Sequence, residues 1–193
     1  LETERDLCFI SPYDDFDVIA GQATVAKEVL SQLDEIDYVF APVGGGGLIS
    51  GMASYIKHYA PQIKVIGVEP VDSPTLFRAL EANERVILDD VGRFADGVAV
   101  KQIGALPFEI AKDSVDDVVL VSNDEMCAAI KDIYEDVRSV SEPAGALSTA
   151  GVKKYILEHG LQGKNIVSVV SGANVNFDRL RYIAERADLG ELN

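Results

Sequence analysis

Four consecutive glycines, Gly44, Gly45, Gly46 and Gly47, followed by Leu48, form the stretch best suited to binding chemistry. Glycine has no Cβ, so the chain can adopt positive φ and turn several backbone N–H groups toward one point. Such a loop at the start of a helix holds a phosphate or another anion without Lys or Arg. The pattern is neither a Gly-x-Gly-x-x-Gly dinucleotide fingerprint nor a Walker loop, since no Gly-Lys-Ser/Thr follows. The sequence therefore predicts an anion-binding loop. A linker or a tight turn is the plainer alternative, but linkers are richer in polar residues.

A second candidate is the stretch from Ser171 to Asn174, which follows an apolar run. A serine at the end of a strand can act as a nucleophile when a histidine activates it. The two histidines do not suit this role, because His58 is expected in the helix after the glycines and His159 at an exposed helix end. The Ser171 hydroxyl is then either a neutral hydrogen-bond partner for a ligand or a group that closes a turn.

The segments around the glycines are those that position a ligand in an α/β sheet. Residues 38–43 form a short β-branched and aromatic run typical of a strand, residues 48–59 carry apolar side chains at helical spacing, and residues 64–69 again suit a buried strand. This order predicts a right-handed βαβ unit with parallel strands. Ligands bind at the carboxyl ends of such strands, where the glycines and Ser171 are both expected.

The remaining segments extend this pattern into an α/β fold, a mostly parallel open sheet with helices on both faces. Asp17 is a predicted N-cap or dipole partner of its helix, and Ser73 is a predicted N-cap. Ser122 and Glu125 form a predicted capping box. Further strands are predicted at residues 8–13, 117–121 and 165–171, the last of them as a central strand. Further helices are predicted at residues 17–33, 74–82, 107–114 and 122–138, from residue 143 onward, and at 177–187. Residues 83–106 are predicted to form a closely packed loop.

The composition argues against several classes of partner. The 193 residues contain 17 Lys and Arg against 32 Asp and Glu, a net charge of −15, so no nucleic acid partner is expected. No apolar run approaches the roughly 20 residues that a membrane helix needs, so no membrane association is expected. Cys8 and Cys127 are too few for a disulfide framework or a metal cluster, which predicts reduced thiols in a cytoplasmic protein.

Several segments, taken in order, resemble the second half of the catalytic domain of the threonine dehydratase (threonine ammonia-lyase) family. That family belongs to the tryptophan-synthase-β-like class of pyridoxal-phosphate enzymes, fold type II. The resemblance covers essentially the whole chain, and residues 179–190 are more like the biosynthetic branch, in which a regulatory domain follows. The segments are Pro-Val-Gly-Gly-Gly-Gly-Leu at 42–48, Gly-Val-Glu-Pro at 67–70, Ala-Asp-Gly-Val-Ala-Val-Lys at 95–101, Asp-Val-Arg at 136–138 with Ser-Glu-Pro-Ala-Gly at 141–145, and Ser-Gly-Ala-Asn-Val-Asn-Phe at 171–177.

The resemblance implies that the cofactor is pyridoxal 5'-phosphate, with its phosphate held by the four glycines and the Leu48 amide. It also implies that Ser171 forms a hydrogen bond at the pyridine nitrogen. An Asp there would keep that nitrogen protonated, whereas a neutral Ser makes the ring a weaker electron sink, which suits an elimination.

Three further positions are identified through the same resemblance. Gly97 would approach the reactive edge of the cofactor, and a loop glycine with positive φ is the alternative interpretation. Glu142 would belong to the cofactor site, and a first-turn carboxylate favoured only by the helix dipole is its alternative. Glu69 lies where related racemases bind a divalent cation. Ser73 and Thr75 stand downstream in place of a second carboxylate, so no metal is expected.

The Schiff-base lysine of the family, in a Ser-Phe-Lys-x-Arg-Gly type motif upstream of the glycines, has no counterpart in this sequence. We therefore expect residues 1–193 to be part of a pyridoxal-phosphate catalytic domain, without its N-terminal lysine-bearing part and without a C-terminal regulatory domain. No catalytic residue is expected in this chain. The chain alone is expected to be inactive, because positioning cannot replace a group that moves the proton.

For the complete enzyme the resemblance implies deamination of L-threonine to 2-oxobutanoate and ammonia, the first step of isoleucine biosynthesis. It implies a homo-oligomer acting on a small amino-acid substrate. Two alternatives stay open. One is an enzyme like serine dehydratase or serine racemase, because the substrate contacts lie mainly outside this chain, and the other is a non-catalytic module that binds a phosphorylated ligand.

Overall fold

A computed structural model, which describes residues 8–190, places four parallel strands in one sheet of order β3-β2-β1-β4. β1 and β2 pair in register from Tyr38↔Lys64 to Pro42↔Val68, and β2 continues two residues further along the edge where the glycines follow β1. The parallel α/β sheet expected from the sequence is confirmed. The strands are β1 (Tyr38–Pro42), β2 (Lys64–Pro70), β3 (Asp117–Val121) and β4 (Ile166–Ser168).

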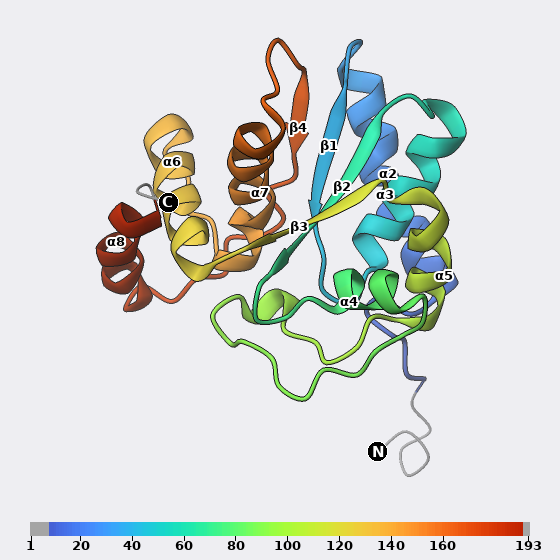
Figure 1. Cartoon of the computed structure of the whole chain (residues 1–193), viewed down its shortest axis with the longest axis horizontal. Coiled ribbons are helices and arrows are strands. Elements are labelled where there is room, and N and C mark those ends of the chain that lie inside the picture. Colours follow the sequence, from blue (N-terminus) through green and yellow to red (C-terminus); the bar gives the residue numbers. More distant parts are fainter. Residues whose placement is uncertain (1–7, 191–193) are drawn as a thin grey trace.

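Helices cover both faces of this sheet, as expected (Figure 1). α8 packs mainly on α6 and forms the outer wall of its layer. None of the helices within residues 8–190 is long and apolar enough to cross a bilayer. One face carries α2 (Phe16–Gln32), α3 (Gly47–Tyr59), α4 (Thr75–Ala82) and α5 (Ala105–Ser114), and the other carries α6 (Asn123–Val137), α7 (Pro143–His159) and α8 (Arg179–Gly190).

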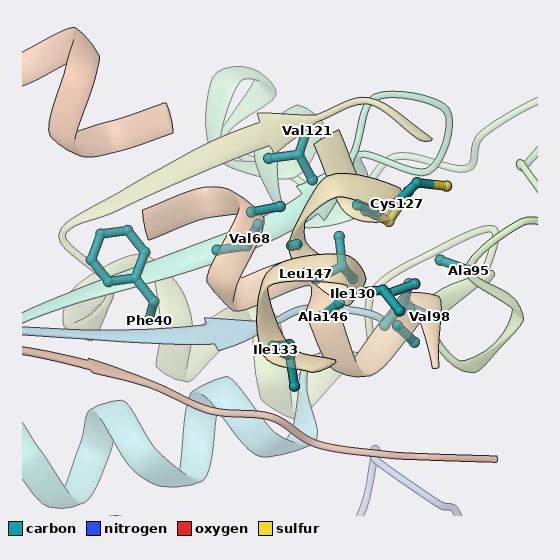
Figure 2. Packing of buried hydrophobic residues seen from close by; sticks show 14 of the residues in the cluster. Phe40, Val68, Ala95, Val98, Val121, Cys127, Ile130, Ile133, Ala146 and Leu147 are labelled. Atoms are coloured by element: carbon teal, nitrogen blue, oxygen red, sulfur yellow. The ribbon is translucent and has the colours of Figure 1, made fainter. Parts of the chain in front are cut away.

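The core has two layers because the central strands bury both of their faces. In β1, Val39 and Ala41 belong to the apolar cluster under α2 and α3, whereas Phe40 belongs to the cluster under α6 and α7. Figure 2 shows the second cluster, to which both Val68 of β2 and Leu147 of α7 belong. Burial on both faces explains why these strands read as continuous apolar runs in the sequence.

Two predicted strands differ from the structure. Residues 8–13 form a loop, in which the Ser11 hydroxyl accepts the Asp14 N–H at 2.9 Å and Pro12 has no N–H to give to a sheet. β4 is a three-residue strand that pairs with β1 alone, so it lies at an edge of the described sheet and not at its centre. Its apolar run predicted a central strand, but the run does not specify how many neighbours pair with it.

The capping box of α6 is confirmed, because the Ser122 hydroxyl accepts the Glu125 N–H at 3.2 Å and the Glu125 carboxylate accepts the Ser122 N–H at 2.6 Å. Asp17 does not cap α2. Asp15 does, since its carboxylate accepts the N–H groups of residues 17 and 18, and Asp17 lies in the first turn at the positive end of the helix dipole.

The predicted Ser73 cap of α4 is wrong. The helix begins at Thr75, and the buried Ser73 hydroxyl has no hydrogen-bond partner in the described part of the chain. The Glu69 side chain, from the end of β2, binds the first amides of α4 instead. Within the predicted loop at 83–106 the chain forms a single 3₁₀ turn, η1 (Asp96–Val98), and α5 begins two residues earlier and α8 two residues later than predicted.

Candidate functional site

The glycine loop, residues 44–47, lies between the end of β1 and the start of α3, at the carboxyl edge of the sheet. Gly46 is the N-cap of α3 with φ of 93°, a left-handed conformation that favours glycine, and it has no side-chain oxygen to offer the helix. Within residues 8–190, no group accepts a hydrogen bond from the amides of residues 44–49. Free N–H groups at a positive helix end form a site suited to an anion.

Close packing also limits the glycine loop to glycine. A Cβ on Gly44 would lie 2.9 Å from the Cα of Val98 in η1. A Cβ on Gly45 would overlap the ring of Tyr13, which packs on this side of the loop. The loop is therefore held between two segments that are distant from each other in the sequence.

The segment that carries Tyr13, residues 11–15, is a part of the site that sequence reasoning missed. The Asp14 carboxylate accepts the N–H groups of Ala105 and Leu106 at 2.8 and 2.9 Å and so caps α5. The neighbouring Asp15 caps α2. Two consecutive carboxylates thus fix the segment between two helix starts and hold Tyr13 against the loop. The available signal was the Asp-Asp pair itself, because Asp is among the most favoured N-cap residues.

Glu142 holds the loop that carries Ser171. Its carboxylate accepts the Asn174 N–H at 2.8 Å, and its own N–H donates to the Gly172 carbonyl at 3.1 Å. The Ser141 hydroxyl donates to the same carbonyl at 3.0 Å. Ser171 is exposed and lines a cavity of about 220 Å³. The Glu142 side chain makes no capping bond to α7, although Glu142 is the N-cap residue at the positive end of that helix. The hydrogen bond of its carboxylate goes to the loop.

Gly97 lies between the two loops. Its φ is not positive, so the interpretation as a loop glycine that needs positive φ is wrong. A Cβ on Gly97 would lie 3.2 Å from the Glu142 Oε1, and the next residue, Val98, is the one that packs on Gly44. The turn η1 therefore connects the glycine loop to the loop of Ser171, and the structure brings all the residues expected to contact the cofactor to one edge of the sheet.

Glu69 is fully buried at the carboxyl end of β2. Its carboxylate accepts the Leu76 and Phe77 N–H groups at 2.8 Å and the Thr75 hydroxyl at 2.9 Å. Burial raises the pKa of Glu69 to about 7, although these donors act to lower it. No group of three or more His, Cys, Asp or Glu side chains placed to hold a metal ion is found in the described chain. The Glu69 oxygens bind the start of α4.

The other reactive side chains are not suited to activate Ser171 or to act as nucleophiles themselves. His58 is exposed in the last turn of α3, and His159 is exposed in the last turn of α7. Ser171 lies at the edge of the sheet where these helices start, so neither histidine is placed beside it. Cys127 is buried on α6, and burial raises the pKa of its thiol to about 12. A thiol with that pKa is not a nucleophile near neutral pH. A triad around Ser171 is therefore not formed by these residues.

Comparison with known sequences assigns the chain to a family. A family model described as pyridoxal-phosphate dependent enzyme matches residues 1–172. Over 191 residues the chain is 55% identical to the protein named L-threonine dehydratase biosynthetic IlvA from Pasteurella multocida (strain Pm70). That match covers 99% of this chain and 37% of the relative, so the chain spans little more than a third of the relative's length.

Solved structures share the same fold. The processed form of threonine deaminase isoform 2 from Solanum lycopersicum matches with a TM-score of 0.96 and 42% identity, over 97% of this chain and 52% of that one. Maize serine racemase matches with a TM-score of 0.86 and 31% identity, over 96% of this chain and 58% of that one. The cofactor of the matched family carries a phosphate, and the free amides of residues 44–49 suit that group. The chain belongs to the pyridoxal-phosphate-dependent enzyme family.

Proposed function

We propose that the complete protein containing this chain uses pyridoxal 5'-phosphate to convert L-threonine to 2-oxobutanoate and ammonia, the first step of isoleucine biosynthesis. The observation that carries the proposal is the row of amides at residues 44–49, which have no acceptor within residues 8–190 and lie at the start of α3. The choice of L-threonine is supported by the 55% identity to a biosynthetic L-threonine dehydratase.

The residues of the carboxyl edge would each have a distinct task. The amides of residues 44–48 would bind the phosphate, and their N–H dipoles at the helix start let a chain of net charge −15 attract an anion. Ser171 would present a hydroxyl to the ring nitrogen, while Glu142 keeps the Ser171 loop in place. Gly97 would let η1 approach the ligand closely. The cofactor, when bound, supplies an electron-withdrawing ring that takes up charge as a bond at the amino-acid Cα breaks.

The group that moves the Cα proton would come from outside this chain. Lys57 and Lys64 pair with Asp116 at 2.6 and 2.8 Å, and Lys164 pairs with Asp37 at 2.8 Å. These pairs lie at the amino ends of the strands, opposite the glycine loop. Lys101 lies nearer the glycine loop, and its ammonium donates to the Asp89 carbonyl at 2.7 Å. Together with the lack of a Ser-Phe-Lys-x-Arg-Gly type motif, these contacts support the proposal that residues 1–193 are part of a catalytic domain whose lysine-bearing part and regulatory domain lie elsewhere in the protein.

A second candidate function is dehydration or racemisation of L-serine. The similarity to maize serine racemase, with a TM-score of 0.86, favours it as the alternative. A non-catalytic module that binds a phosphorylated ligand is the alternative outside enzymes. Assembly of the complete enzyme as a homo-oligomer and a cytoplasmic location are also parts of the proposal. The unpaired Cys8 and Cys127 fit a reducing compartment.

Turnover of two substrates by the full-length protein tests the proposal. The protein is given pyridoxal 5'-phosphate and either L-threonine or L-serine, and 2-oxo acid, ammonia and D-serine are measured. We expect 2-oxobutanoate and ammonia in equal amounts and a higher kcat/KM for L-threonine than for L-serine. A higher kcat/KM for L-serine, or D-serine as the main product, would favour the second candidate. Tight binding of the cofactor with no product from either substrate would favour the non-catalytic module.

A further inference from the structure

Thr75 connects the start of α4 to the glycine loop. Its hydroxyl has one proton, which it shares between the Glu69 Oε1 at 2.9 Å and the Gly44 carbonyl oxygen at 3.2 Å. Thr75 and Glu69 have no exposed surface. Glu69 lies near the end of β2 and Gly44 follows the end of β1, so one buried hydroxyl bridges the carboxyl ends of two paired strands.

Glu69 in turn fixes the position of Thr75. Its carboxylate accepts the N–H groups of Leu76 and Phe77, both at 2.8 Å, in the first turn of α4. The N-cap residue of this helix, Pro74, forms no side-chain bond to it. The carboxylate therefore takes the place of a cap, and it holds both the helix start and the Thr75 side chain relative to β2.

The Gly44 carbonyl controls the direction of an amide in the glycine loop. The Gly44 C=O and the Gly45 N–H belong to one planar trans peptide group, so the two bonds point in opposite directions. A hydrogen bond that holds the carbonyl toward Thr75 therefore turns the Gly45 N–H away from Thr75. This N–H is one of the amides without an acceptor in the described chain.

We propose that Thr75, held in place by Glu69, is a positioning residue that directs the Gly45 amide toward a bound phosphate. The inference rests on the proposed function, because it takes the glycine loop as the phosphate site. Thr75 does not touch the ligand; it acts through one peptide group. Removing its hydroxyl should therefore weaken binding of the phosphate end of the cofactor and leave the contacts of the ring unchanged.

The experiment compares two ligands on the full-length protein. Dissociation constants are measured for pyridoxal 5'-phosphate and for pyridoxal, which lacks the phosphate, together with the midpoint of thermal unfolding. The variants are Thr75→Val, which removes the hydroxyl at nearly constant volume, and Thr75→Ser, which keeps it. The matched control is Thr24→Val, because the Thr24 hydroxyl also donates to a backbone carbonyl, that of Gly21 at 2.7 Å, but on the exposed surface of α2.

We expect Thr75→Val to weaken binding of pyridoxal 5'-phosphate about fivefold, the effect of one lost hydrogen bond, and to leave the affinity for pyridoxal unchanged. Thr75→Ser should restore tight binding, and Thr24→Val should change neither constant. Thr75→Ala gives the same comparison if the valine methyl against the carboxylate prevents folding.

Equal weakening of both ligands would overturn the inference, since a purely structural role affects the whole site. An unchanged affinity for both ligands would also overturn it. A wild-type protein that binds pyridoxal 5'-phosphate no more tightly than pyridoxal would mean that the protein has no site that binds the phosphate. That result is a failure of the proposed function, visible before any variant is measured, and the role of Thr75 would fall with it.

Discussion

Gly45 shows how little space surrounds the glycine loop at the scale of single residues. A Cβ on Gly45 would overlap the ring of Tyr13. The next two residues, Asp14 and Asp15, bind the starts of α5 and α2 and so anchor the segment that carries this tyrosine. The two carboxylates fix the backbone on both helix starts, so the Tyr13 ring can give way only by changing its own rotamer. A methyl group at this position therefore has to displace a well-anchored neighbour.

Replacement of Gly45 by alanine should destabilise the protein by roughly 2 kcal/mol, the usual cost of overpacking, and should weaken binding of pyridoxal 5'-phosphate. Urea unfolding and a binding titration measure the two effects. Gly21→Ala is the control, because no heavy atom lies within 4 Å of a Cβ there and the residue is in the interior of α2. That control should gain up to about 1 kcal/mol of helix stability. A stable Gly45→Ala variant with unchanged binding would contradict the packing described for Tyr13.

Glu69 should make the stability of the fold depend on pH. Burial raises its pKa from the ordinary 4.5 to about 7, so between these values the folded state binds the proton more tightly than the unfolded chain. The stabilisation from the protonated carboxyl is complete below pH 4.5 and is lost as the pH rises through 7. The loss amounts to about 3 kcal/mol.

Glu69→Gln carries no titratable group and isolates this effect from that of other residues. The difference in unfolding free energy between wild type and Glu69→Gln, measured by urea unfolding from pH 4.5 to pH 8, should shift against the wild type as the pH rises. A difference that does not change over this range, or one that shifts toward the wild type, would show that the folded-state pKa of Glu69 is not raised.

The sequence predicted some of these residues and missed others for a physical reason. The glycine loop was found because four glycines before a helix have few other uses, and Ser171 because it follows a strand. Tyr13 and the link between Thr75 and Gly44 were missed, since both depend on contacts between segments far apart in the chain. Glu69 was noticed only as a doubtful metal ligand, and its role at the start of α4 required the positions of both elements.

Helix starts hold the site together at the scale of secondary-structure elements. α2 and α5 are capped by adjacent residues of one short segment, α4 by a residue from β2, and α6 by its own capping box. The caps of α2 and α5 share the segment that covers the glycine loop. Loss of one cap should therefore loosen both a helix and the site.

Asp14→Ala should cost about 1 kcal/mol in unfolding free energy, because α5 loses the carboxylate that binds its first two amides. Asp17→Ala is the matched control: Asp17 lies in the first turn of α2, where a carboxylate contributes only a few tenths of a kcal/mol through the helix dipole. Equal losses in the two variants, measured by urea unfolding, would contradict a capping role for Asp14.

Elements with a local signal were predicted well, and those set by neighbours were not. The capping box of α6 and the strand, helix, strand unit of β1, α3 and β2 depend on residues close in sequence, and both are confirmed. β4 was placed at the centre of the sheet because its run is apolar, yet it pairs with β1 alone. The position of a strand within a sheet depends on which strands pair with it, and the apolar run contains no information about those partners.

The site as a whole lies at one edge of the sheet, while several lysines of the chain are bound at the opposite edge. Lys57 and Lys64 share Asp116, and Lys164 pairs with Asp37. The chain thus holds residues suited to binding a cofactor phosphate but leaves these lysines far from it. We expect this chain to bind the cofactor phosphate and the rest of the protein to supply the group that moves the proton.

The 193-residue chain by itself should therefore form no 2-oxobutanoate from L-threonine above the rate of free pyridoxal 5'-phosphate, whereas the full-length protein should do so readily. A coupled assay that reduces the 2-oxo acid measures both samples. Turnover by the isolated chain, together with a reducible covalent bond between the cofactor and one of its own lysines, would contradict this division of roles.

A crystal structure of the full-length protein with pyridoxal 5'-phosphate is the most direct test of the central claim. The cofactor phosphate is expected within hydrogen-bond distance of the amides of residues 44–48, at the start of α3, with Ser171 at the ring nitrogen. A phosphate bound at any other place in the protein, with these amides turned to solvent, would contradict the account.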